Sequence, residues 1–70
     1  MKTNFDSEEV VWMAQYADWD LEEVKTILPT MFPNAKDITI DSFEPETMYV
    51  TVDGKSYAIT PDGEIIDEED

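Results

Sequence analysis

Apolar residues recur with the period of a helix between Glu8 and about Ala17. The residues that share one face at 100° per residue are Val10, Met13, Ala14 and Ala17. Trp12 and Tyr16, four residues apart, lie nearly opposite this face, beside Glu8 and Glu9. The pattern therefore predicts a first helix with an aliphatic face and a separate aromatic stripe.

A second helix is predicted over about 21–28, followed by a turn to about residue 32. Asp20 and Glu23 match a capping box at its start. Apolar residues then continue at helical spacing through Leu21, Val24, Ile27 or Leu28, and Met31. Pro29 has no backbone N–H to donate, so we expect the helix to end before it.

Beyond Pro33 the period changes to two, which is typical of strands. The pattern predicts one strand over about 37–43 and a second that ends at the Asp53-Gly54 turn, a strong hairpin signal. A two-residue loop there pairs Val52 with Lys55, Val50 with Tyr57, and Met48 with Ile59. A second turn at 61–63 precedes a short strand over 64–67, in which either Ile65 or Ile66 points inward.

These elements predict an α+β fold, with two short N-terminal helices packed on an antiparallel β-meander of three to four strands. We expect a single compact acidic domain over residues 1–66 and a disordered acidic end at 67–70. The segment 1–5 is either frayed or a short strand.

Charge distinguishes this chain from ordinary small domains. Its 70 residues include 18 acidic residues and four basic ones, for a net charge of −14. Small domains usually carry a net charge of magnitude roughly 2–8. Both halves are acidic. Halophile proteins also have acidic surfaces, but a chain with only lysine as its basic residue and more isoleucine than leucine better fits an AT-rich bacterial or phage genome.

Several function classes are excluded by composition. The chain has no cysteine or histidine, so it has no disulfide, no thiolate or imidazole metal ligand and no histidine base. The only glycines, Gly54 and Gly63, lie in predicted turns, and the carboxylates of 62–70 lack calcium-loop spacing. We therefore expect no enzyme activity, no cofactor and no dedicated metal site.

The chain also lacks the clustered basic residues that direct nucleic-acid binding requires. It has no long apolar run and no signal-peptide profile, which favours a cytoplasmic protein that does not enter a membrane. Both a monomer and a dimer that pairs through an edge strand near Ile38 or Ile65 are compatible with the pattern.

The charge density resembles that of nucleic acid, because 14 charges correspond to roughly 24 Å of duplex DNA. In size and acidity the chain resembles the phage-encoded DNA mimics that block restriction, CRISPR or repair enzymes. This resemblance implies an inhibitor that occupies the basic DNA- or RNA-binding surface of a host protein. The expected contact residues are Glu8, Glu9, Asp18, Asp20, Glu22, Glu23, Asp37, Asp41, Glu44 and Glu46, with Trp12, Trp19 or Tyr49 as an anchor.

The alternative is a non-enzymatic adaptor that binds a protein partner through the aromatic stripe of Trp12, Tyr16 and Trp19. Such residue types are enriched at interface hot spots. A small domain also needs its large side chains for packing, so we expect at least two of these three aromatic residues to lie in the core.

Overall fold

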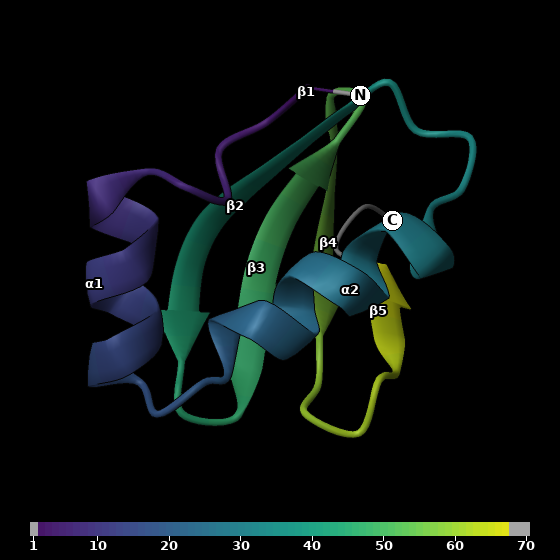
Figure 1. Cartoon of the computed structure of the whole chain (residues 1–70). Coiled ribbons are helices and arrows are strands. Elements are labelled where there is room, and N and C mark those ends of the chain that lie inside the picture. The colour runs from purple at the N-terminus through teal and green to yellow at the C-terminus, as the bar shows by residue number, and fades with distance from the viewer. Residues whose placement is uncertain (1, 68–70) are drawn as a thin grey trace.

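A computed structural model describes residues 2–67 as two helices and a five-stranded sheet (Figure 1). The helices are α1 (Glu8–Tyr16) and α2 (Leu21–Met31). The strands are β1 (Lys2–Thr3), β2 (Asp37–Glu44), β3 (Thr47–Val52), β4 (Lys55–Ile59) and β5 (Ile65–Asp67). The predicted α+β class is confirmed.

The sheet differs in detail from the predicted antiparallel meander. Its strand order is β1-β2-β3-β4-β5, and β1 runs parallel to β2 while the other pairs are antiparallel. The predicted antiparallel meander is therefore present as the four strands β2–β5, and β1 adds a fifth, parallel strand at its edge. The two residues of β1 are too few to show alternation, and the two-helix connection from β1 to β2 permits their parallel pairing.

Asn4 continues the edge of the sheet beyond β1. Its side-chain amide donates to the Ile40 carbonyl at 3.0 Å, and its side-chain oxygen accepts from the Ile40 N–H at 2.8 Å. One side chain thus satisfies both backbone groups of a β2 residue, as a paired strand would.

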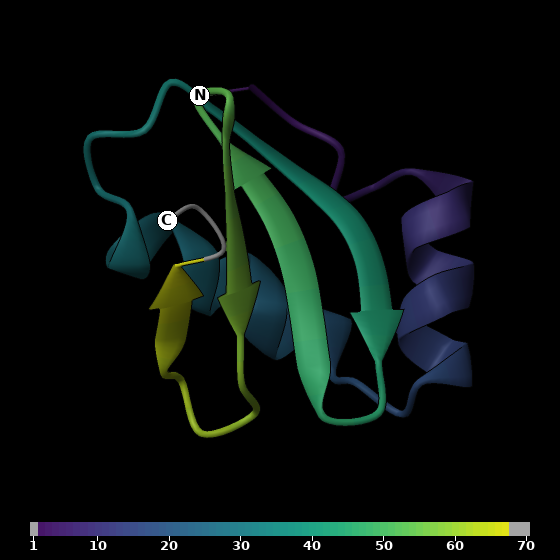
Figure 2. The same ribbon diagram turned by 180° about the vertical axis from the view of Figure 1, so that it is seen from behind.

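The core lies between the helices and one face of the sheet. The helix α2 crosses this face, whereas α1 lies beside β2, and the opposite face is uncovered by helices (Figure 2). The side chains buried most completely are Leu28, Ile38, Met48, Ile59, Val10 and Val50. They belong to both helices and to β2, β3 and β4, so one apolar cluster joins all of these elements.

The start of α2 agrees with the sequence, but its end does not. Asp20 is the N-cap, and its carboxylate accepts from the N–H groups of Glu22 and Glu23. The expected end at residue 28 is wrong, because Pro29 lies inside the helix. The complete burial of Leu28 and the packing of Met31 on the core stabilise the last turns of α2. This stabilisation exceeds the cost of placing a proline, which lacks an N–H donor, inside the helix.

The hairpin register is confirmed. Val52 pairs with Lys55, and Asp53 and Gly54 both have positive φ, as a two-residue turn of this type requires. In the last strand Ile65 pairs with Ile59 of the core, whereas Ile66 pairs with Ala58 on the opposite face. Asp67 belongs to β5, and the remainder of the expected disordered end, residues 68–70, lies outside the described residues.

The described chain has a radius of gyration of 11.0 Å and extents of 27 × 24 × 17 Å. Neither helix within residues 2–67 has the length and apolar character needed to cross a membrane.

Candidate functional site

Three of the four lysines lie at one end of the sheet. Lys2 pairs with the first residue of β2, and its N–H donates to the Lys36 carbonyl at 3.0 Å. Lys55 follows the β3–β4 turn, and Asp53 in that turn accepts from the N–H of Lys36. The start of β2 and the β3–β4 turn therefore share one end of the molecule, at the top of Figure 1.

The opposite end carries acidic residues from every segment that meets there. These segments are the α1–α2 loop, the first turn of α2, the β2–β3 turn and the β4–β5 turn (Figure 1). We call this the acidic end, and it comprises Asp18, Asp20, Glu22, Glu23, Glu44, Glu46, Asp62 and Glu64. Among the described residues, it includes no lysine.

The backbone at the end of α1 positions the acidic loop. The N–H groups of Asp18 and Trp19 donate to the carbonyls of Gln15 and Ala14, at 3.3 and 2.8 Å, and Asp18 has a φ of 63°. This is the arrangement of a Schellman motif, which reverses the chain and satisfies the last carbonyls of the helix. As a result Asp18 is exposed, while Trp19 turns towards the sheet.

Trp19 fastens this loop to the end of β2. Its indole N–H donates to the Glu44 carbonyl at 2.6 Å, and its ring packs against Phe43 with a centroid distance of 5.6 Å. The side chain is packed against the core, so Trp19 holds two acidic segments together. Trp19 is half-buried, so its structural role leaves part of the side chain exposed at the acidic end.

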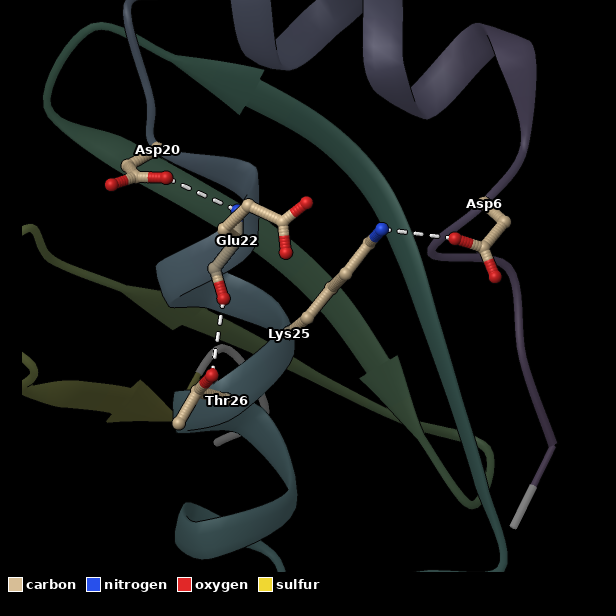
Figure 3. Close-up of polar contacts among 5 residues, drawn as sticks. All are labelled: Asp6, Asp20, Glu22, Lys25 and Thr26. Atoms are coloured by element: carbon tan, nitrogen blue, oxygen red, sulfur yellow. Dashed lines mark hydrogen bonds and ion pairs between the residues drawn. The ribbon is translucent and has the colours of Figure 1, made fainter.

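Three of the four lysines are too far away to neutralise the acidic end. The eight residues of β2 span roughly 23 Å at about 3.3 Å per residue, whereas charges are screened over about 8 Å at physiological ionic strength. Lys25 is nearer, but it forms an ion pair with Asp6 at 2.9 Å (Figure 3). That hydrogen bond raises the pKa of Lys25, and the charges of Asp6 and Glu22 raise it further. Within residues 2–67, no group of three or more acidic side chains is placed to hold a metal ion.

The outer face of α1 is the second surface that stands out. Trp12 is 69% exposed and Tyr16 is 90% exposed, and both follow Glu8 and Glu9 on the same helix face. The expectation that at least two of the three aromatic residues lie in the core is wrong, since only Trp19 is packed there. The aliphatic face of α1 already contacts β2 and α2, and no other element in the described part of the chain covers Trp12 and Tyr16.

The other predicted contact residues lie apart from these two surfaces. Asp37 begins β2 at the lysine-bearing end, and Asp41 accepts a hydrogen bond from the Thr51 hydroxyl at 2.7 Å on the uncovered sheet face. Tyr49 lies half-buried on that same face, opposite Ser42 and Ala58. Of the predicted acidic contact residues, the structure therefore brings together those of the acidic end, which are Asp18, Asp20, Glu22, Glu23, Glu44 and Glu46.

Sequence reasoning missed Asp62 and Glu64 as members of the acidic end. The signal was present in the topology, because alternate turns of an antiparallel meander lie at the same end of the sheet. The β2–β3 and β4–β5 turns are such a pair.

No family model matches the chain, and searches of curated proteins and of solved structures give no match.

Proposed function

We propose that this protein is a small acidic inhibitor that acts as a nucleic-acid mimic. It occupies the basic DNA- or RNA-binding surface of a host protein that processes nucleic acid or defends against foreign nucleic acid, as restriction and CRISPR enzymes do. The carboxylates of the acidic end take the place of phosphates and pair with lysine and arginine side chains of the target.

The observation that carries this proposal is the separation of charge along the sheet. A uniformly acidic surface would favour solubility without favouring a particular orientation. Here eight acidic residues belong to segments that meet at one end, whereas three lysines offset Asp37 and Asp53 at the other. Such a polarised field steers a basic partner towards the acidic end and speeds association.

The dimensions are also compatible with mimicry. Residues 2–67 include 15 acidic residues and four lysines, a net charge of −11 that corresponds to roughly 19 Å of duplex, and their longest extent is 27 Å. The domain thus carries a charge per length of the same order as that of the ligand that it would replace.

A second candidate function is an adaptor that binds a partner through α1. The exposure of Trp12 and Tyr16 favours it, because large aromatic side chains at the centre of an interface contribute much of the binding energy. This interaction would depend on apolar contact and would tolerate salt.

The two functions are separated by capture from nuclease-treated bacterial lysate with charge-matched variants. In the first variant, Glu22, Glu23, Glu44 and Glu46 become glutamine. The matched variant carries Glu8→Gln, Glu9→Gln, Asp37→Asn and Asp41→Asn. Each variant loses four charges, two of them from the first turn of a helix, so their net charges are equal.

Mimicry predicts that the first variant weakens capture of a nucleic-acid-binding protein by roughly tenfold or more, and the matched variant far less. Capture by the wild type also falls steeply between about 50 and about 500 mM salt. Equal losses in both variants would contradict the proposal. Salt-resistant capture that is lost on Trp12→Ala would favour the adaptor instead.

A further inference from the structure

A groove of about 280 Å³ lies within the acidic end, between α2 and the turns that follow β2 and β4. Its floor consists of Val24, Met48 and Ile59, which are at most 4% exposed. Ile27 and Trp19 are half-buried and form its walls. The acidic end is therefore not uniformly polar, because its centre is apolar.

Exposed residues surround this apolar floor, and they are distributed unequally. The residues at the edge of the groove are Asp18, Asp20, Glu23, Pro45, Pro61 and Gly63. The three carboxylates belong to the α1–α2 loop and to the first turn of α2, so they lie along one side. The prolines and the glycine come from the two turns of the sheet.

These carboxylates have capacity for further partners. Asp20 accepts two backbone N–H bonds as the N-cap of α2. Within residues 2–67, the carboxylates of Asp18 and Glu23 accept no hydrogen bond and pair with no lysine. A donor that enters the groove would therefore meet carboxylate oxygens that can accept further hydrogen bonds.

The chemistry of the groove selects its occupant. A metal ion gains nothing from an apolar floor, and an anion is repelled by the carboxylates. A purely apolar side chain would remove the carboxylates from water without giving them a donor, which is costly. A side chain with an apolar stem and a cationic head satisfies both parts of the groove.

We infer that the groove receives an arginine side chain of the protein that the acidic end binds. The methylene groups lie along Ile27, Met48 and Ile59, and the guanidinium group donates to the carboxylates of Asp18, Asp20 and Glu23. Arginine suits this edge better than lysine does, because its five donors form a planar fork that can serve more than one carboxylate. The volume is just below the range of about 300–1,000 Å³ for small-molecule sites and fits one side chain. This inference rests on the proposed function and names the group that the acidic end recognises.

The test is an NMR titration of the isotopically labelled full chain with a capped Ala-Arg-Ala peptide. A second peptide carries citrulline, which has nearly the same shape and no charge. We expect backbone shifts concentrated over residues 18–27 and 62–63, and binding of the arginine peptide roughly tenfold tighter than that of the citrulline peptide. Equal affinity for both peptides, or shifts as large at Asp37 and Asp41, would overturn the inference.

Two variants probe the parts of the groove separately. The Asp18→Asn, Glu23→Gln pair keeps the shape and the left-handed backbone at Asp18, which asparagine tolerates. It should weaken arginine binding more than the charge-matched Asp37→Asn, Asp41→Asn pair does. Ile27→Phe should weaken binding by filling the groove without changing charge. Equal effects of the two charge-matched pairs would show that net charge alone attracts the peptide, which contradicts the inference.

The peptide test and the capture experiment can fail independently. If the peptide binds in the groove but lysate yields no nucleic-acid-binding protein, the proposed function fails. If capture depends on the acidic end but the peptides bind alike, the groove assignment fails and mimicry stands.

Discussion

At the scale of single residues, Lys25 and Asp6 join α2 to the segment that precedes α1 (Figure 3). The hydrogen bond with Asp6 raises the pKa of Lys25 above its ordinary value of 10.5. A raised lysine pKa means that the folded state binds this proton more tightly than the unfolded state does. The pair therefore stabilises the fold fully below the unfolded pKa and ceases to do so as pH rises through the folded pKa.

We predict that Lys25→Met lowers the melting temperature at neutral pH, because it removes the ammonium group and keeps the aliphatic stem. The difference from the wild type should be constant up to about pH 9 and shrink towards about pH 12. Melting curves of both proteins over this range measure it. In an Asp6→Asn background the effect of Lys25→Met should be smaller. A difference that grows with pH would contradict the assignment.

The two tryptophans show what residue type alone predicts and what it does not. The helical period placed Trp12 opposite the aliphatic face, and its exposure agrees with that geometry. The preference for burying large side chains failed because no other element of residues 2–67 covers the outer face of α1. Trp19 is packed because the chain reversal at Asp18 turns it inward, and the sequence showed only an interruption there.

At the scale of elements, the two helices begin with different caps. The Asp20 carboxylate accepts from the N–H groups of Glu22 and Glu23 at 3.1 and 3.4 Å. Ser7 precedes α1 in an extended conformation, but its side chain makes no capping bond. The side chain of the N-cap residue therefore stabilises the start of α2, whereas that of α1 gives no such hydrogen bond.

We predict that Asp20→Ala lowers the free energy of unfolding by about 1 kcal/mol, because the cap is lost. Ser7→Ala should change it by less than about 0.5 kcal/mol. Urea denaturation followed by circular dichroism measures both. Asp20→Asn is the control that removes the charge and keeps the acceptor, and it should retain most of the stability. Equal losses for Asp20→Ala and Ser7→Ala would contradict the cap assignment.

The elements that alternate strongly were predictable, whereas the shortest one was expected only as one of two alternatives and its parallel pairing was not predicted. The register of the hairpin followed from Asp53-Gly54 and the alternation of Met48, Val50 and Val52. The parallel strand β1 has only two residues and is continued by the side chain of Asn4. Neither feature leaves a periodic signal. The extension of α2 past Pro29 depends on burial of Leu28, which is a tertiary effect.

At the scale of the whole molecule, the charge is polarised by topology. Along the sequence the acidic residues are spread over both halves, and the sequence gives no sign of a gradient. Folding brings three turns and the start of α2 to one end, and most of the lysines to the other. The composition therefore predicted an anionic surface, whereas its direction required the strand order.

Competition by nucleic acid is the most direct measurement of mimicry. The wild-type protein is immobilised, loaded with its partner from nuclease-treated lysate, and washed with a DNA duplex or an RNA oligonucleotide at constant ionic strength. If the acidic end occupies a nucleic-acid-binding groove, the oligonucleotide releases the partner, while a simple salt wash of equal ionic strength leaves it bound. A partner that stays bound at saturating concentrations of both oligonucleotides would contradict the account.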